Sequence, residues 1–175
     1  YDDDLAKQRD CRQKIWTASG ILSDLVNEVL DMSKLESGEV KLDLRPVNLV
    51  ELINEVCKMM ERQAQQLGVT ISCDMSGVAH PSIVASPLHL KRLIMNIASN
   101  AVKYNKPGGS VRVTCTEHAH EGEVATYDIV IADTGIGMSS EFQARMFEPF
   151  AREQQKGAER ATGTGLGTAI AKQLA

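Results

Sequence analysis

The hydrophobic pattern is most regular in the first 35 residues. Apolar side chains recur there at alternating intervals of four and three, at Cys11, Ile15, Ala18, Leu22, Leu25, Val29 and Met32. Such spacing puts them on one stripe of a long helix. Leu35 and the turn-like Glu36-Ser37-Gly38 would end that helix. We predict a long amphipathic helix that packs in a bundle or coiled coil; an ordinary core helix is the alternative.

A change of period follows this helix. Residues 39–45 alternate apolar and polar side chains, which predicts a half-buried strand ended by Pro46. The sequence Asn48-x-x-Glu51 is a capping box that opens a second helix. Gly68 is expected to end that helix. Its predicted inner face consists of Leu49, Leu52, Ile53, Val56 and Met60.

Further elements are predicted along the rest of the chain. A helix should begin at Ser86-Pro87, with Ser86 as its N-cap, and run to about Tyr104. Strands are expected at 69–75, 83–85, 110–117 and 124–132, a short helix at 140–146 and a last helix from about Gly167. This order favours an α+β protein, a two-layer α/β sandwich preceded by the long helix.

Composition narrows the class of protein. A net charge of -4 argues against a dedicated nucleic-acid binder. Four widely separated cysteines, without a CxxC pair, are typical of reduced thiols in a cytosolic protein. Neither a membrane-spanning apolar run nor a signal-peptide pattern is present. Because the pattern begins and stops within helices, we expect the chain to be part of a longer protein.

The helix after Pro87 carries an unusual polar stripe beside its apolar one. Asn96, Asn100 and Lys103 share this stripe, although asparagine is a poor former of helix interiors. Amide oxygens are hard, neutral ligands that suit Mg²⁺, and a lysine one turn on could meet phosphate oxygens. The alternative is a pair of solvated asparagines on an exposed face.

Two glycine-rich segments follow. The apolar run before Asp133-Thr-Gly135-Ile-Gly137 predicts a carboxylate at a strand end, able to accept a hydrogen bond from an exocyclic amine such as adenine N6. The segment Gly163-Thr164-Gly165-Leu166-Gly167 opens the last helix, where successive N–H groups would form an anion site. An ordinary strand-end turn and a flexible linker are the respective alternatives. Residues 151–162 between the two segments have the composition of a mobile flap.

Together these segments resemble a known family. Asn96-x-x-x-Asn100-Ala-x-Lys103-Tyr104 resembles the N box of sensor histidine kinases, and Asp133-Thr-Gly-Ile-Gly137 resembles their G1 box. Phe147-Glu-Pro-Phe150 is similar to the F box, and Gly163-Thr-Gly-Leu-Gly167 to the G2 box. All four occur in the family's order. Leu30-Asp-Met-Ser-Lys-Leu-Glu-Ser-Gly38 also looks like the end of the second helix of the dimerisation and phosphotransfer hairpin.

The resemblance implies two domains. Residues 1–38 would be the second hairpin helix, and residues 39–175 an ATP-binding HATPase domain of the Bergerat fold. The family's final strand is expected to be missing from that domain, as this chain shows no counterpart after the last helix.

The resemblance also implies a set of site roles. Asp133 would bind adenine, Asn100 and Asn96 would hold Mg²⁺, and Lys103 would contact phosphate. Residues 151–162 would form the ATP lid, anchored apolarly by Phe147 and Phe150. The remaining residues expected to bind or shape the nucleotide site are Tyr104, Gly135, Gly137, Phe150, Gly163, Thr164, Gly165, Leu166 and Gly167.

The chain departs from the family in one important respect. The substrate histidine of these kinases stands in a context like Ser-His-Glu, but His80, His89, His118 and His120 do not. The acidic neighbour that could act as general base is missing as well. We therefore expect the chain to bind ATP without phosphorylating itself. Smaller departures are Ser86 in place of a common Asp and Thr168 in place of a common Leu.

The function implied is transfer of the ATP γ-phosphoryl group to a histidine, for relay to an aspartate of a response-regulator receiver domain. The full-length protein would be a bacterial homodimer joined through the helical hairpin, with this part in the cytoplasm beneath a membrane-bound sensor. One alternative is a dimerisation module whose ATP site is vestigial. Another is an ATPase of the gyrase, chaperone or mismatch-repair kind.

Overall fold

The computed structural model describes residues 2–37, 42–118, 124–153 and 164–174. It divides into two compact units, Tyr1–Val40 and Lys41–Ala175. Within the first unit the described residues form one continuous helix, α1 (Asp2–Glu36), as the heptad spacing predicts. Among the stripe residues Ile15, Leu22 and Val29 are exposed. The expected packing of this stripe in a bundle remains a prediction.

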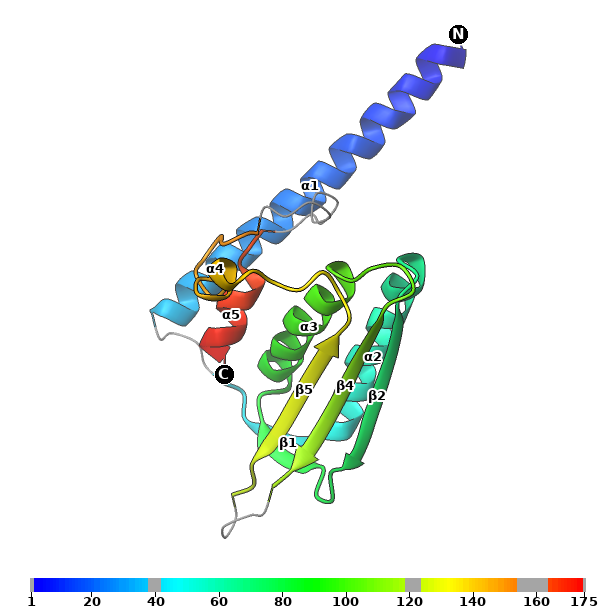
Figure 1. Cartoon of the computed structure of the whole chain (residues 1–175). Coiled ribbons are helices and arrows are strands. Elements are labelled where there is room, and N and C mark those ends of the chain that lie inside the picture. The colour runs from blue at the N-terminus through cyan, green and yellow to red at the C-terminus, as the bar shows by residue number, and fades with distance from the viewer. Residues whose placement is uncertain (1, 38–41, 119–123, 154–163, 175) are drawn as a thin grey trace. The chain divides into compact units, whose positions relative to one another are not determined.

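The second unit is built on a three-stranded sheet (Figure 1). Its order is β2 (Thr70–Gly77), β4 (Ser110–Glu117), β5 (Tyr127–Asp133), with β2 and β4 parallel and β4 and β5 antiparallel. Alternate residues of β4, from Val111 to Cys115, are buried beneath the helices. One face of the sheet therefore forms the floor of the core.

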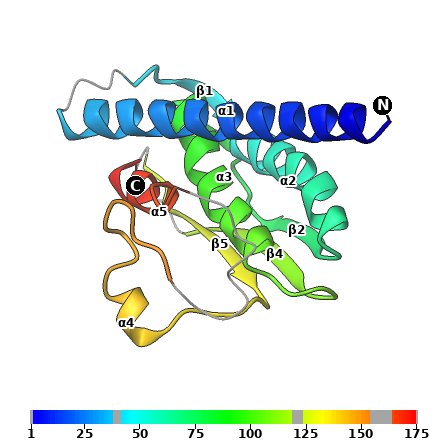
Figure 2. The same ribbon diagram turned by 90° about the horizontal axis from the view of Figure 1, so that it is seen from above.

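Helices cover that face in a second layer. As Figure 2 shows, α3 (Pro87–Lys103) lies between α2 (Leu49–Gln66) and α5 (Gly167–Leu174). The predicted inner face of α2 is buried throughout. The Asn48 side chain caps α2 by accepting the Glu51 N–H at 3.1 Å, and Gly68 follows its end with φ +67°. The predicted two-layer α+β sandwich is confirmed.

The first strand differs from its prediction. A strand was expected at 39–45 and Pro46 was expected to end it, but β1 is Arg45–Asn48 and includes the proline. It pairs with β3 (Ser82–Ala85) in a separate two-stranded sheet, where Pro46 lies opposite Val84. Proline is tolerated because both strands are edges. Residues 38–41 lie outside the described residues.

Ser86 is the N-cap of α3, as predicted, but its side chain does not cap the helix. Ser86 has the extended backbone of an N-cap and is buried, but its hydroxyl forms no capping hydrogen bond to the helix backbone. Instead its Oγ is hydrogen-bonded to Nδ1 of His89 at 2.7 Å. Ser86 is therefore connected to the first turn of α3 through the His89 side chain. Pro87 supplies the fixed φ of the first helical position.

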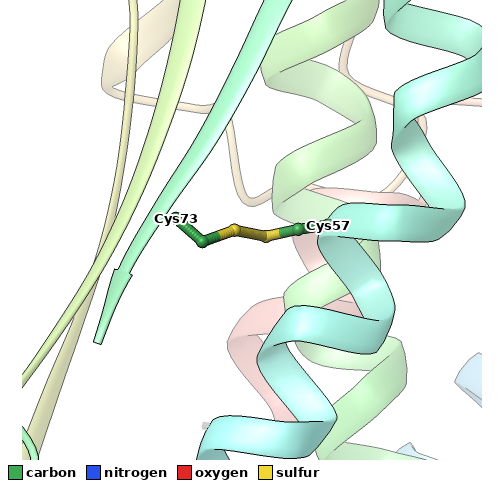
Figure 3. Close-up of a disulfide and its surroundings, with 2 residues drawn as sticks. All are labelled: Cys57 and Cys73. Atoms are coloured by element: carbon green, nitrogen blue, oxygen red, sulfur yellow. A yellow bond between two sulfur atoms is a disulfide. The ribbon is translucent and has the colours of Figure 1, made fainter. Parts of the chain in front are cut away.

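Two of the four cysteines are joined, against the prediction of four reduced thiols. Cys57 of α2 and Cys73 of β2 form a disulfide between the two layers, with Cα atoms 7.0 Å apart (Figure 3). Cys11 and Cys115 remain free thiols. The bonded cysteines are 16 positions apart in the sequence, so the pairing follows from the packing of α2 on the sheet and not from a local motif.

Thiol reactivity should follow this arrangement. Iodoacetamide should label exposed Cys11 quickly and Cys115 slowly, because Cys115 is buried and burial raises the pKa of its thiol. Cys57 and Cys73 should be labelled only after reduction. Peptide mass spectrometry of the native, the unfolded and the unfolded-and-reduced chain would check each site. Labelling of Cys57 in the unfolded chain without reductant would contradict the disulfide.

A buried carboxylate fixes the connection from β2 to β3. Glu117, whose side chain is 7% exposed, accepts the N–H groups of Ala79 and His80 at 2.8 and 2.7 Å, and its second oxygen lies 2.7 Å from Nδ1 of His80. The hydrogen bonds from the His80 backbone and ring, followed by that from Ala79, lower the pKa of Glu117 from 4.5 to about 2.

This carboxylate should make stability depend on pH. A depressed folded-state pKa stabilises the fold above pH 4.5, and the contribution is lost as the pH falls toward 2. The substitution Glu117→Gln should therefore lower the urea midpoint at pH 7, by an amount that shrinks toward pH 3. Glu55→Gln is the matched control, because Glu55 is exposed and its ion pair with Lys91 lies at the surface. A deficit for Glu117→Gln that stays constant over this pH range would contradict the assignment.

Candidate functional site

The polar stripe of α3 is present as predicted. Asn96 and Asn100 are half-buried on this helix, whose opposite side buries Ile94 and Ala98 in the core. Among the described residues the Asn96 Nδ2 atom is buried without a hydrogen-bond partner. A buried donor left unpaired is costly, so this amide favours a ligand acceptor beside α3.

The next two residues lie at the end of α3. The Lys103 ammonium stands over the Tyr104 ring, with Nζ 4.9 Å from the ring centroid. Tyr104 is the C-cap of the helix. Its carbonyl oxygen accepts the N–H of Ile136 at 3.1 Å, which joins the end of α3 to the first glycine segment.

That glycine segment follows β5 directly. Asp133 ends the strand and accepts the Gly135 N–H at 2.8 Å through Oδ1. A Cβ at Gly135 would overlap the Tyr104 carbonyl oxygen and lie 2.7 Å from Asp133 Oδ1, so only glycine fits there. Gly137 has φ +69°, a conformation that also favours glycine. The carboxylate is thereby fixed at the end of the strand beside α3.

The second glycine segment opens α5. Leu166 is 1% exposed, and its N–H donates to Oγ1 of Thr164 at 3.2 Å. A Cβ at Gly167 would lie 3.8 Å from Cγ of Asn96, so this turn stands against the polar stripe of α3. Gly165 has φ +79°. Gly163 and residues 154–162 of the predicted lid lie outside the described residues.

The phenylalanines of the F box, Phe147 and Phe150, are 44% and 57% exposed. Most of the lid that they are expected to anchor lies outside the described residues, so their apolar anchoring remains a prediction. Phe150 has φ +63°. The segment lies just beyond α4 (Ser140–Gln143), which is shorter than the predicted helix at 140–146.

Several residues that support the site were not predicted. Thr134 accepts the Ser110 N–H at 2.9 Å, and Asn105 donates to the carbonyl groups of Ala101 and Ser110 at 3.1 and 3.0 Å. These bonds fix the start of the G1 segment between α3 and β4. The turn-forming sequence after Tyr104 is the only local signal that could have indicated Asn105.

The three described histidines are engaged outside the nucleotide motifs. His80 pairs with Glu117, His89 with Ser86, and His118 with Asp128, the last through Nε2 and Oδ2 at 2.7 Å. His120 lies outside the described residues.

Comparison with known proteins decides the family. A family model for "Histidine kinase-, DNA gyrase B-, and HSP90-like ATPase" matches residues 85–175, which contain all four boxes. The chain belongs to this family. The matched range begins just before α3 and takes in both glycine segments.

Relatives within the family are sensor kinases. The chain is 32% identical over 168 residues to the sensor histidine kinase GacS of Pseudomonas protegens, covering 96% of this chain and 18% of that protein. It is 36% identical over 165 residues to the histidine protein kinase DivJ of Caulobacter vibrioides, covering 92% and 26%. The chain thus spans about a quarter or less of the length of these relatives.

Solved structures of histidine kinases also match this chain. Full-length ShkA, crystallised with AMPPNP, matches with a TM-score of 0.77 and 30% identity over 96% of this chain and 33% of that one. The Acinetobacter baumannii kinase AdeS matches with a TM-score of 0.71 over 93% of this chain and 70% of that one, and at 18% identity it supports the fold alone. The prediction of an ATP-binding catalytic domain of the sensor histidine kinase type is confirmed. Among the described helices none is long and apolar enough to cross a bilayer.

Proposed function

We propose that this chain binds MgATP between α3, the end of β5 and the start of α5, and transfers the γ-phosphoryl group to a histidine outside these 175 residues. The observation that carries the proposal is the Asn96 amide beside the turn at Gly167, whose buried Nδ2 has no hydrogen-bond partner among the described residues. A ligand rich in acceptor oxygens would satisfy that amide, and a triphosphate is such a ligand.

The base would bind at the other end of the site. Asp133 uses Oδ1 for Gly135, and its Oδ2 makes no hydrogen bond within the described ranges. That oxygen is suited to accept the adenine amine, with the Gly135–Gly137 backbone close to the ring plane. Tyr104 would lie near the sugar or base, because its carbonyl is bonded into the same turn.

The phosphates would lie along α3 and the α5 turn. Lys103 would contact them as a point charge, and the N–H groups of Gly165 and Gly167 in the turn would donate to them. Phe150 and the glycines at 163, 165 and 167 would shape this end. The contacts within the described residues support these proposed roles.

The α3 amides fit a magnesium ion. Asn100 and Asn96 offer hard amide oxygens one turn apart, beside the proposed phosphates. Asn96 could contribute its oxygen while its unpaired Nδ2 donates to a phosphate. Bound Mg²⁺ would neutralise phosphate charge, and the chain's part is to orient the phosphates.

The phosphoryl acceptor must come from elsewhere in the full-length protein or from a partner. We propose that the first helix of the hairpin supplies this histidine and that α1 is the second helix, with its exposed stripe forming a homodimer. From there the phosphate would pass to a response-regulator aspartate. ThkA, a kinase of similar fold with a TM-score of 0.61, has been crystallised with the response regulator TrrA, although its 20% identity supports only the fold. A cytoplasmic location in a bacterial membrane sensor is part of the same proposal.

Phosphotransfer in trans would test the proposal. The chain, radiolabelled ATP and Mg²⁺ would be incubated with a separately made hairpin helix carrying a Ser-His-Glu sequence. We expect acid-labile, base-stable phosphate on that helix. Asn100→Asp should abolish it, since an added carboxylate repels the phosphates. Labelling that persists in Asn100→Asp would contradict the assigned site, and no ATP binding by the unsubstituted chain would favour the dimerisation module.

A further inference from the structure

Helix α5 carries a row of contacts to the turn at 146–151. The Thr168 hydroxyl donates to the Met146 carbonyl oxygen at 2.6 Å, although 22 residues separate them. The Lys172 ammonium lies 5.4 Å from the centroid of the Phe147 ring. Positions 168 and 172 are four apart and share one face of the helix. This face therefore holds the segment just before and within the F box.

A third contact lies at the glycine turn itself. A Cβ at Gly165 would lie 2.8 Å from the carbonyl carbon of Phe150 and 2.9 Å from the Ala151 oxygen, so the two backbones are in direct contact. On its other side the same turn meets Asn96 through Gly167. The turn is thus held between the 146–151 segment and the polar stripe of α3.

We propose that Thr168 is a positioning residue for the phosphate end of the nucleotide. Its hydrogen bond to Met146 sets the separation between the first turn of α5 and the 146–151 segment, and with it the direction of the N–H groups at 165–167. Threonine in a helix commonly bonds its own preceding turn, so a bond across 22 residues is a specific tertiary contact. The inference rests on the proposed ATP site.

Loss of the Thr168 hydrogen bond should affect binding only at the phosphate end of the nucleotide. Asp133 accepts the Gly135 N–H, and the Tyr104 carbonyl accepts the Ile136 N–H, contacts in which α5 takes no part. Loss of the Thr168 bond should therefore weaken binding of phosphates without weakening binding of adenosine. A residue that only stabilises the fold would affect both ligands alike.

Two substitutions at one position test this. Thr168→Val keeps the shape of the side chain and removes the donor, whereas Thr168→Ser keeps the donor. Titration with ADP and with adenosine in the presence of Mg²⁺, by calorimetry and ligand-observed NMR, would give the dissociation constants. We expect Thr168→Val to raise the Kd for ADP about fivefold, the value of one ordinary hydrogen bond, with adenosine changed less than twofold. Thr168→Ser should remain within twofold of the unsubstituted chain for both.

Lys172→Met provides a second variant if Thr168→Val does not fold, which circular dichroism would show. It removes the ammonium over Phe147 without touching the Thr168 bond, and should raise the Kd for ADP about twofold to threefold while sparing adenosine. Equal weakening of ADP and adenosine, no weakening of ADP, or no rescue by Thr168→Ser would overturn the inference. Failure of the unsubstituted chain to bind ADP would instead overturn the proposed function, so the two are distinguishable.

Discussion

Replacing Asp133 by asparagine should weaken ATP binding about a hundredfold. The carboxylate has two acceptor oxygens, of which Oδ1 takes the Gly135 N–H at 2.8 Å. Asparagine has one such oxygen. If this oxygen accepts the Gly135 N–H, the NH₂ group of the asparagine would face the adenine amine, so that two hydrogen-bond donors would oppose each other. Losing a charge-assisted bond and leaving unpaired donors costs about 3 kcal/mol, which corresponds to roughly a hundredfold in Kd.

The same substitution should alter which base is preferred. Inosine triphosphate carries an oxygen where adenine carries the amine, so it should bind poorly to the Asp133 carboxylate and better to the asparagine amide. Calorimetric titration of both nucleotides against both chains would measure the change. Asp128→Asn is the matched control, because Asp128 lies on the same strand but pairs with His118. Equal loss of affinity for both nucleotides would argue that Asp133 acts on the fold and not on the base.

Much of the fold could be predicted from sequence because its signals are local. The Asn48 cap, the buried stripe of α2 and the end at Gly68 depend on residues within one helix, and the structure shows each of them. The alternation of β4 from Val111 to Cys115 likewise follows from burial of one sheet face.

Features decided by tertiary pairing could not be predicted. The alternation over 39–45 has the period of a strand, but β3 offers its hydrogen bonds to Arg45–Asn48, and Leu44 remains 60% exposed. Cys57 and Cys73 are far apart in sequence and meet only because α2 packs on β2. No periodicity in the chain carries that information.

The candidate site also combines features that local sequence predicts with features that depend on tertiary contacts. The α3 amides and the Asp133–Gly135 turn are local patterns, so their placement could be anticipated. The Thr168 bond to Met146 could not, because threonine at this position gives no sign of a partner 22 residues earlier. Motifs thus predict which residues should meet the ligand, whereas the contacts that hold those motifs in place required the structure.

Gly165→Ala is expected to be the most damaging single change in the α5 turn. The backbone there has φ +79°, which costs an L-residue about 1–2 kcal/mol. The new Cβ would also lie 2.8–2.9 Å from backbone atoms of Phe150 and Ala151, which cannot rotate aside as a side chain can. Overpacking of this kind costs about 1–3 kcal/mol more.

Alanine substitutions at two other glycines with similar φ distinguish the cost of backbone strain from the cost of steric overlap. Gly108 and Gly137 have φ +77° and +69°, and a Cβ at either meets nothing within 4 Å among the described residues. Alanine at Gly108 should therefore cost only the backbone strain and leave ADP binding intact. Gly165→Ala should lower the urea unfolding free energy by about 3 kcal/mol, or else displace the turn and raise the Kd for ADP more than tenfold. If Gly165→Ala matched Gly108→Ala in both stability and ADP affinity, the close packing of the α5 turn on the 146–151 segment would be wrong.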